Sequence, residues 1–481
     1  MDLFANASDI TNGIKDGSIS AEEYIVKLLE HARKVDDRVH AYISLNDNAV
    51  ERARQIDIAI EKGESVGRLA GVAIAIKDNI CTKGLRTTCA SKMLEDYVPP
   101  YNATVVERLV NEGAIIIGKT NLDEFAMGST TEFSAFGPSR NPWNPELVPG
   151  GSSGGSAVSL ASGESTVALG SDTGGSIRCP ASFCSVVGLK PTYGLVSRYG
   201  LVSFANSLEL IGPMARSVYD VALVLSCIAG RDAMDHTTLD VDEKDYTASI
   251  KDGVEGLKIG LIKEMLSDGV DEIVSTSIQD AASKFESLGA TVDVVSLSSL
   301  QYALASYYTI ATAEASSNLA RYDGIRYGRG MRPDGFEWNS YCTKARSSFG
   351  DEVKRRIIIG TYVLSSGYYG KFYLKAQKVR TLIKQEFALL FKRFNLLIAP
   401  TMPLLPFKIG EKNLDPLQMY MSDVNTVPAN LAGIPSISVP CAFKDNLPVG
   451  LQIMGDHLNE EMILRAAYSF EEVAKVKKVT A

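Results

Sequence analysis

The sequence predicts an α/β fold in which one mostly parallel or mixed β-sheet lies between helical layers in a single large domain. Short apolar runs alternate along the chain with longer segments of helical periodicity, which is typical of a sheet covered on both faces. No linker interrupts this alternation, although 481 residues could hold two or three domains. With 45% hydrophobic residues, the chain can bury an extensive core.

The first 64 residues are predicted to form a helical segment that packs on the main domain, residues 65–481. Ser20 begins a capping box that ends at Glu23, and apolar residues follow at helical spacing, so a helix begins near residue 20. A second helix covers about residues 47–62 and ends at Gly63, because glycine commonly follows a helix C-terminus.

The main domain is predicted to alternate strands with helices. Residues 72–76 form a continuous apolar run, as expected of a buried strand. A helix is expected over 103–112, where Gly113 stops it, and a longer one over about 375–394. Further strands are expected at residues 114–117, 257–262, 290–295, 396–399, 437–439 and 451–454.

Residues 113–120 match the phosphate-binding pattern G-x-x-x-x-G-K-[ST]. The four residues between the glycines are Ala-Ile-Ile-Ile, which suit a buried strand and not an open loop whose amides hold phosphate. We therefore interpret this segment as a strand.

Composition and charge indicate a cytoplasmic enzyme. A net charge of −8 argues against broad electrostatic binding of nucleic acid by this chain. No apolar run approaches the roughly 20 residues of a membrane span, and the N-terminus lacks the pattern of a secretion signal. The seven cysteines are odd in number and include no C-x-x-C pair, so free thiols in a reducing compartment are expected.

Two glycine-serine clusters between Gly150 and Arg178 form the strongest functional signal. Glycines let backbone amides approach a ligand, and such clusters could surround a nucleophilic serine, Ser152 or Ser176. No histidine lies within fifty residues of this segment, so the base must be another group. Lys77 ends the apolar run 72–76, where burial would lower its pKa enough for it to accept a proton.

Residues 151–155 also match G-x-S-x-G, and Asp423 and His457 follow in the order of an α/β-hydrolase triad. A nucleophile elbow must leave a strand directly, whereas three prolines stand within residues 142–149 and exclude a central strand there. The lysine-dependent arrangement is therefore favoured.

The blocks GGSSGGSA and GSDTGGSIR, with GVAIAIKDNI upstream, resemble the amidase signature family. The separations are similar too, with 75 residues from Lys77 to Ser152 and 24 from Ser152 to Ser176. Within that family the chain is most similar to the A subunits of glutamyl-tRNA(Gln)/aspartyl-tRNA(Asn) amidotransferases. This likeness spans about residues 65–470 and rests on GKTNLDEFAMGSTTE, GLKPTYGLVSRYGLVSFANSLELIGP, AEASSNLARYDGIRYG, GDEVKRRIIIGTYVLSSGYY and TVPANLAGIPSISVP.

The resemblance implies a mixed sheet between helical layers and assigns catalytic roles. Ser176 is the expected nucleophile, Ser152 is expected to relay the proton of Ser176, and Lys77 is the expected final base. The resemblance also implies that the Gly151–Ser152 peptide bond is cis. Ser153 is expected to support Lys77. Backbone amides at and before the nucleophile, those of Thr173, Gly174, Gly175 and Ser176, are expected to receive the oxyanion.

The resemblance also implies residues that recognise the α-substituents of glutamine. Arg356 is the expected partner of the carboxylate and Asp423 of the ammonium, with Tyr307 nearby. Two alternatives remain open. The basic run 354–356 is also typical of a solvated helix face, and Tyr308 could take the place of the adjacent Tyr307.

The function implied is a glutaminase that delivers ammonia to a partner. That partner would hold tRNA, use ATP and Mg²⁺, and convert Glu-tRNA(Gln), Asp-tRNA(Asn) or both, in a heterotrimer with B and C subunits. No cofactor or metal is expected in this chain. A stand-alone amidase for small or aryl amides and a scaffold for the tRNA-binding partner are the alternatives. Arg356 with Asp423 favours the glutaminase over the general amidase, and the intact serine-lysine set argues against a scaffold.

Three residues depart from the pattern of these A subunits. Cys179 and Phe133 stand where glutamine and asparagine are commoner, and Leu210 replaces a common glutamine. Cys179 is expected to be a buried structural thiol, although it follows Ser176 closely. These departures bear on the pocket lining and the ammonia route.

Overall fold

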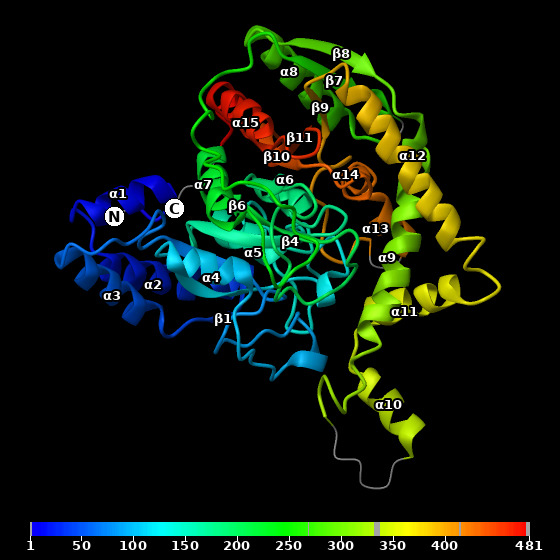
Figure 1. Ribbon diagram of the computed structural model, residues 1–481, viewed down its shortest axis with the longest axis horizontal. Coiled ribbons are helices and arrows are strands. Elements are labelled where there is room, and N and C mark those ends of the chain that lie inside the picture. Colours follow the sequence, from blue (N-terminus) through cyan, green and yellow to red (C-terminus); the bar gives the residue numbers. More distant parts are fainter. Residues whose placement is uncertain (1, 268, 331–336, 413–414, 478–481) are drawn as a thin grey trace.

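A mixed β-sheet forms the centre of the molecule (Figure 1). The computed structural model describes residues 2–267, 269–330, 337–412 and 415–477, and over these ranges the 11-stranded sheet has the order β1-β3-β2-β4-β6-β5-β10-β11-β9-β7-β8. The strands are β1 Tyr42–Leu45, β2 Ala73–Lys77, β3 Ile115–Thr120, β4 Val167–Asp172, β5 Val187–Lys190, β6 Leu210–Ala215, β7 Lys258–Ile262, β8 Thr291–Val295, β9 Leu396–Pro400, β10 Ser436–Lys444 and β11 Leu447–Met454.

Neighbouring strands run in both directions. The parallel pairs are β2 with β3, β2 with β4, β7 with β8 and β7 with β9. The other neighbouring pairs are antiparallel. The sheet is therefore mixed, as the sequence pattern allowed.

Helices cover both faces of the sheet, which confirms the predicted layers. Successive strand residues point to opposite faces. Ile74 and Ile76 of β2 share an apolar cluster with α4, α7, α8 and α15, whereas Ala73 and Ala75 share one with α2, α3, α5 and α6. A third cluster joins Leu397 of β9 to α9, α11, α12 and α14.

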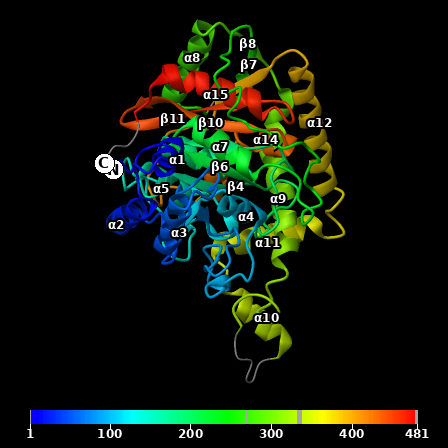
Figure 2. The same cartoon turned by 60° about the vertical axis from the view of Figure 1, so that its left-hand side comes forward.

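Figures 1 and 2 show α9, α11 and α12 on the opposite side of the molecule from α1, α2 and α3, with α10 projecting away from the sheet. The helices are α1 Ala7–Lys15, α2 Ala21–Val39, α3 Ala49–Glu61, α4 Thr104–Asn111, α5 Gly154–Ala161, α6 Arg178–Cys184, α7 Val218–Ile228, α8 Glu272–Ser287, α9 Ala303–Leu319, α10 Trp338–Arg346, α11 Asp351–Leu364, α12 Tyr373–Phe391, α13 Pro416–Met421, α14 Val427–Ala432 and α15 Glu460–Ala474.

The predicted elements are confirmed to within a few residues. The Ser20 hydroxyl accepts the Glu23 amide at 3.2 Å and caps α2, as the capping box predicted. The segment that matches the phosphate-binding pattern forms β3, with its isoleucines in the sheet. Sequence analysis missed β1, β5 and β6; β1 and β5 have only four residues each, and β1 pairs antiparallel with β3.

The N-terminal segment 1–64 does more than pack on the rest of the chain. Its strand β1 forms one edge of the sheet, while Tyr24 and Leu28 of α2 share an apolar cluster with residues of β2, β3 and α5. Within the described ranges, no helix is both long enough and apolar enough to cross a bilayer.

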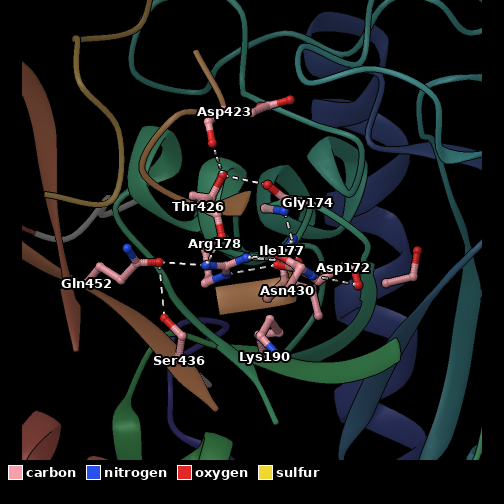
Figure 3. A network of polar contacts seen from close by, with 12 residues as sticks. Asp172, Gly174, Ile177, Arg178, Lys190, Asp423, Thr426, Asn430, Ser436 and Gln452 are labelled. Atoms are coloured by element: carbon pink, nitrogen blue, oxygen red, sulfur yellow. Dashed lines mark hydrogen bonds and ion pairs between the residues drawn. The ribbon is translucent and has the colours of Figure 1, made fainter. Parts of the chain in front are cut away.

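A buried ion pair ties the connection between β4 and α6 to the other half of the sheet (Figure 3). Arg178 and Asp172 are fully buried, and Arg178 Nη2 lies 3.0 Å from Asp172 Oδ1. Burial favours the neutral form of Asp172, but the nearby Arg178 charge outweighs it and lowers its pKa to about 2. Arg178 also donates to Thr426 O at 2.9 Å, Gln452 Oε1 at 2.6 Å and Asn430 Oδ1 at 2.6 Å.

Replacing Arg178 with leucine should leave the Asp172 carboxylate buried without its opposite charge. We expect a loss of about 3 to 5 kcal/mol in the free energy of unfolding, measured by chemical denaturation at pH 7. Because Asp172 has a lowered pKa of about 2, this stabilisation is present above the unfolded carboxyl pKa of about 4 and is lost as pH falls toward 2.

The matched control is Arg231→Leu, which removes the exposed Arg231–Asp240 pair, 3.3 Å apart. Exposed pairs contribute little, so this change should cost less than about 1 kcal/mol. Equal losses in the two variants would contradict the importance of the buried pair.

Candidate active site

The candidate active site lies where the parallel strands β2 and β4 end. Lys77 is the last residue of β2, Asp172 is the last residue of β4, and the two strands are hydrogen-bonded neighbours. Residues 173–177 then lead into α6, and α5 begins at Gly154, so both glycine-serine clusters reach this edge. In α/β sheets, ligands commonly bind at the carboxyl ends of the strands.

Lys77 is the centre of a hydrogen-bond network. Its Nζ donates to the hydroxyls of Ser152 at 2.8 Å, Ser153 at 2.9 Å and Ser171 at 2.9 Å. Ser171 O is a fourth acceptor, 3.3 Å from Nζ, so the three N–H donors of a lysine ammonium have enough acceptors here. The fold thus places Lys77 beside two of the serines that the sequence singled out.

Burial lowers the pKa of Lys77 to about 7. The side chain is fully buried, and loss of hydration disfavours its ammonium form. The negative charges of Asp123 and Asp172 act in the opposite direction and raise the pKa. Lys77 can therefore exchange between its charged and neutral forms near pH 7, as a general base must.

Ser152 and Ser153 lie in the turn before α5, and the Gly151–Ser152 peptide bond is cis. The Ser153 amide donates to Ser176 O at 3.0 Å, which joins the two glycine-serine clusters directly. The Ser153 hydroxyl also donates to Ser171 O at 3.1 Å. The segments that carry the base, the relay and the nucleophile are thereby held together.

Ser176 is the most accessible member of the candidate set. It is 8% exposed, whereas Lys77 and Ser152 are fully buried. The hydrogen bonds of the described residues include none between the Ser152 and Ser176 hydroxyls. Catalytic hydrogen bonds often tighten only once substrate is present. The least buried serine of the set, held beside the Lys77 network, suits a nucleophile.

One predicted oxyanion donor, the amide of Gly175, is wrong. The Gly175 amide donates to Asp172 Oδ1 at 2.9 Å, so this N–H is already engaged and is not available to an oxyanion. A Cβ at Gly174 would lie 2.4 Å from Cζ of Tyr307, so only glycine fits there. In the part of the chain that the structure describes, the amides of Thr173, Gly174 and Ser176 make no hydrogen bond to a protein group and remain the candidate donors.

Arg356 does not lie on a solvated helix face, which settles one alternative. It is 2% exposed in α11, and its Nε donates to Glu352 Oε1 at 2.7 Å. Its guanidinium lies over the rings of Tyr308 and Tyr420, at 5.3 and 5.4 Å from their centroids. Its Nη2 is buried without a hydrogen-bond partner among the described residues, so one donor remains for a carboxylate.

Asp423, which follows α13, bonds to the hydroxyl of Tyr308. Its carboxylate accepts from the Ser129 hydroxyl at 2.8 Å and from the Tyr308 hydroxyl at 2.7 Å. Burial raises its pKa to about 6, so the carboxylate is mostly charged at neutral pH. Tyr308 contacts both charged groups: its ring lies under Arg356 and its hydroxyl donates to Asp423.

The two adjacent tyrosines of α9 have different positions. Successive residues of a helix point about 100° apart. Tyr307, the predicted residue, packs against Gly174 in the loop before Ser176, while Tyr308 bonds to Asp423. Tyr307 therefore lies beside the loop that carries Ser176, and Tyr308 makes the hydrogen bond to Asp423.

Sequence analysis missed several residues of the site. Ser171 bonds to Lys77 and directly precedes Asp172 at the end of β4, so the rule on strand ends could have found it. Asp123 and Ser129 lie in a block used for the resemblance, without an assigned role. Lys190 is a second buried lysine whose pKa burial lowers to about 7, but its amine donates to Pro191 O at 3.1 Å and to no serine.

Two of the residues that depart from the pattern of the A subunits, Cys179 and Leu210, are buried, and Phe133 is partly exposed. Cys179 is fully buried, its thiol donates to Ser129 O at 3.6 Å, and burial raises its pKa well above the usual range. A neutral thiol is a poor nucleophile, which favours the structural role. Leu210 is buried in β6 opposite Asp172, and the Phe133 amide donates to Asp123 Oδ1 at 3.2 Å.

The alternative triad is wrong. His457 makes no hydrogen bond or ion pair with Ser152 or Asp423 among the described residues, and its backbone amide donates to Asp456. The described ranges also contain no cluster of three or more histidine, cysteine, aspartate or glutamate side chains placed to hold a metal ion.

The chain is similar to known amidases along almost its whole length. It matches the amidase family over residues 23–464. It is 55% identical to the A subunit of glutamyl-tRNA(Gln) amidotransferase from Methanosarcina mazei, over 98% of this chain and 97% of that protein. The same-named protein of Caldanaerobacter subterraneus is 54% identical, over 95% of this chain and 94% of that protein.

Solved structures agree with these sequence matches. The crystal structure of the glutamyl-tRNA(Gln) amidotransferase A subunit from Thermotoga maritima superposes with a TM-score of 0.80 at 44% identity, covering 94% of this chain and 92% of that chain. Peptide amidase from Stenotrophomonas maltophilia superposes with a TM-score of 0.84 at 31% identity, covering 98% of each chain. The chain belongs to the amidase signature family.

Proposed function

We propose that this chain is the glutamine-hydrolysing A subunit of a glutamyl-tRNA(Gln) amidotransferase. The observation that carries the proposal is the 2.8 Å hydrogen bond from buried Lys77 to Ser152, beside the accessible Ser176. The relatives of that name, 54 and 55% identical over nearly the full chain, support the substrate and the assembly.

The chemistry is acyl transfer through Ser176. Its Oγ attacks the side-chain carbonyl carbon of glutamine while its proton passes to Ser152, and the proton of Ser152 passes to neutral Lys77. The amides of Thr173, Gly174 and Ser176 stabilise the oxyanion. The C–N bond then breaks, a proton returns to the leaving nitrogen, and ammonia departs. Water hydrolyses the resulting γ-glutamyl ester to glutamate and frees Ser176.

Glutamine is selected by its two charged α-substituents. The free Nη2 of Arg356 binds the α-carboxylate, and Asp423 binds the α-ammonium. Both groups are nearly inaccessible to water, which strengthens these contacts compared with surface pairs. Ser153 keeps Lys77 in position, and Tyr307 lines the loop that carries Ser176.

Ammonia would pass to the partner B and C subunits, which hold tRNA and use ATP and Mg²⁺. The net charge of −8 supports binding of tRNA mainly by the partner. An exposed aromatic patch at the end of α11 and the start of α12 supports a protein assembly, since large exposed apolar patches mark interaction sites. The patch consists of Ile358, Tyr362, Tyr368, Tyr369, Phe372 and Leu374.

A stand-alone amidase is the second candidate. The Asp423 carboxylate already accepts two hydroxyl hydrogen bonds, from Ser129 and Tyr308, so it is partly satisfied without an ammonium. The similarity to a peptide amidase points the same way. A purely scaffolding role is disfavoured. Burying a lysine among three serines costs desolvation free energy, and a scaffold has no use for a buried base.

The pH dependence should report Lys77. Because burial lowers its pKa to about 7 and the neutral amine is the base, kcat/KM for glutamine should rise with pH through about 7 and then level off. Asp423 must also be charged and has a pKa of about 6. Below pH 6, the logarithmic plot should therefore approach a slope of two for glutamine but one for an uncharged amide.

Lys77→Arg is the companion variant, because a guanidinium stays protonated and cannot accept the proton. It should lose activity by about a thousandfold or more. Activity of Lys77→Arg near the wild-type level, or a profile without a rise near pH 7, would refute Lys77 as the base.

The charged pair should determine selectivity for glutamine. Arg356→Ala and Asp423→Ala should each lower kcat/KM for glutamine, by an amount that corresponds to about 2 to 5 kcal/mol of lost transition-state stabilisation. Each variant leaves a charged group of the substrate unpaired. Hydrolysis of a simple uncharged amide should change little. Steady-state kinetics with both substrates make the comparison.

Arg355→Ala is the matched control, because Arg355 is 39% exposed on the same helix and pairs with the same Glu352. This variant should change kcat/KM for either substrate by no more than about threefold. Equal losses on both substrates in the Arg356 variant would show that this residue supports the fold instead, and a wild-type preference for the simple amide would favour the stand-alone amidase.

Ser176→Ala should separate ammonia supply from tRNA amidation. The assembled complex carrying this variant should form no glutaminyl-tRNA with glutamine, because no γ-glutamyl ester can form. High ammonium should restore product, since the partner needs only a nitrogen nucleophile. Amidated tRNA is measured in both conditions. Failure of ammonium in an intact complex would contradict this division of labour.

A further inference from the structure

Thr131 brackets the segment that presents Ser152 to Lys77. Its hydroxyl donates to Gly150 O at 2.8 Å and accepts from the Gly154 amide at 3.1 Å. One side chain therefore contacts the backbone on both sides of Ser152, which lies midway between these glycines. The turn before α5 is in this way closed by a side chain from a different part of the chain.

Asp123 holds Thr131 in this position. Its Oδ2 accepts the amides of Thr131 at 2.9 Å and Thr130 at 3.2 Å, and its Oδ1 accepts the amide of Phe133 at 3.2 Å. Thr131 has φ of 61°, a conformation that β-branched residues rarely adopt and that the surroundings must enforce. Both Asp123 and Thr131 are fully buried.

Asp123 also lies directly against the turn. A Cβ on Gly151 would lie 2.3 Å from Asp123 Oδ2, so the carboxylate occupies the space beside the residue that precedes Ser152. The carboxylate is thus in contact with the serine turn and, through Thr131, bonded to both of its ends.

We propose that Asp123 and Thr131 are positioning residues for catalysis, and that they act as a clamp that holds Ser152 within hydrogen-bond reach of Lys77 and Ser176. This inference rests on the proposed relay through these three residues. Neither clamp residue contacts Arg356 or Asp423 by a hydrogen bond in the described part of the chain, so the clamp acts on the rate of the chemical step and not on glutamine binding.

The primary test is Thr131→Val, which keeps the shape of the side chain and removes both hydroxyl bonds. In the full chain with its partner subunits, kcat for glutamine hydrolysis should fall about tenfold to a hundredfold, because small displacements of catalytic groups cost this much. KM should stay within about threefold. Thr131→Ser retains the hydroxyl and should restore kcat to within about threefold of wild type.

Thr130→Val is the matched control. Thr130 is the adjacent buried threonine, and its amide bonds to Asp123 while its hydroxyl contacts neither Gly150 nor Gly154. It should keep kcat within about threefold of wild type. Equal losses in Thr130→Val and Thr131→Val, or no rescue by Thr131→Ser, would overturn the clamp.

Asp123→Asn adds a readout that a purely structural role would not change. The charges that raise the Lys77 pKa include those of Asp123 and Asp172, while Lys77 and Glu132 influence the pKa of Asp123. Removing the Asp123 charge removes an influence that raises the Lys77 pKa, so the midpoint of the pH profile should move below its wild-type value. In Thr131→Val the midpoint should not move. A wild-type midpoint in Asp123→Asn would overturn the electrostatic part of the inference.

Labelling with a fluorophosphonate separates this inference from the proposed function. The reagent phosphonylates an activated serine with loss of fluoride and needs no glutamine-binding residue. Wild-type protein that is not labelled at Ser176 would refute the relay itself. Labelling of Thr131→Val at the wild-type rate would refute the clamp alone, whereas slow labelling that Thr131→Ser restores would support it.

Discussion

The buried contact between Asp172 and Arg178 is the constraint on which the site depends. Asp172 accepts from Arg178 and from the amide of Ile177 (Figure 3). It also accepts from the amide of Gly175, so both neighbours of Ser176 are bonded to it. The orientation of the nucleophile is therefore set by one carboxylate. The Arg178 charge is the main influence that opposes burial and keeps this carboxylate ionised, so the loop depends on Arg178.

Arg178 carries this constraint into the rest of the molecule. Its other donors bond to groups that arrive with α14 and β11, far away in sequence. The Thr426 hydroxyl lies within hydrogen-bond distance of Gly174 O at 2.5 Å and Asp423 O at 3.1 Å, so it connects the loop of Ser176 to Asp423, the proposed ammonium-binding residue. Chemistry and recognition are thus mechanically coupled through one network.

Burial at this site has opposite effects on its charged groups. It lowers the pKa of Lys77 to about 7 and makes the amine a usable base, but it raises the pKa of Asp423 to about 6 and of Asp123 to about 6. Stronger desolvation would raise the pKa values of these carboxyl groups further and leave them neutral at pH 7. Hydroxyl and amide donors to Asp423 and Asp123 limit this effect, and keep both residues charged near pH 7.

The amino-acid order alone is enough to predict the alternation of strands and helices, the position of Lys77 at the end of a buried strand and the need for a base other than histidine. These features are local, because an apolar run or a capping residue acts over a few neighbours. The roles of Ser152 and Ser176 came from the resemblance. The folded chain was needed to learn that Gly175 is already bonded, that Tyr308 and not Tyr307 contacts Asp423, and that Thr131 closes the serine turn. These contacts join residues far apart in sequence or depend on which way one helix faces, and no local pattern encodes either.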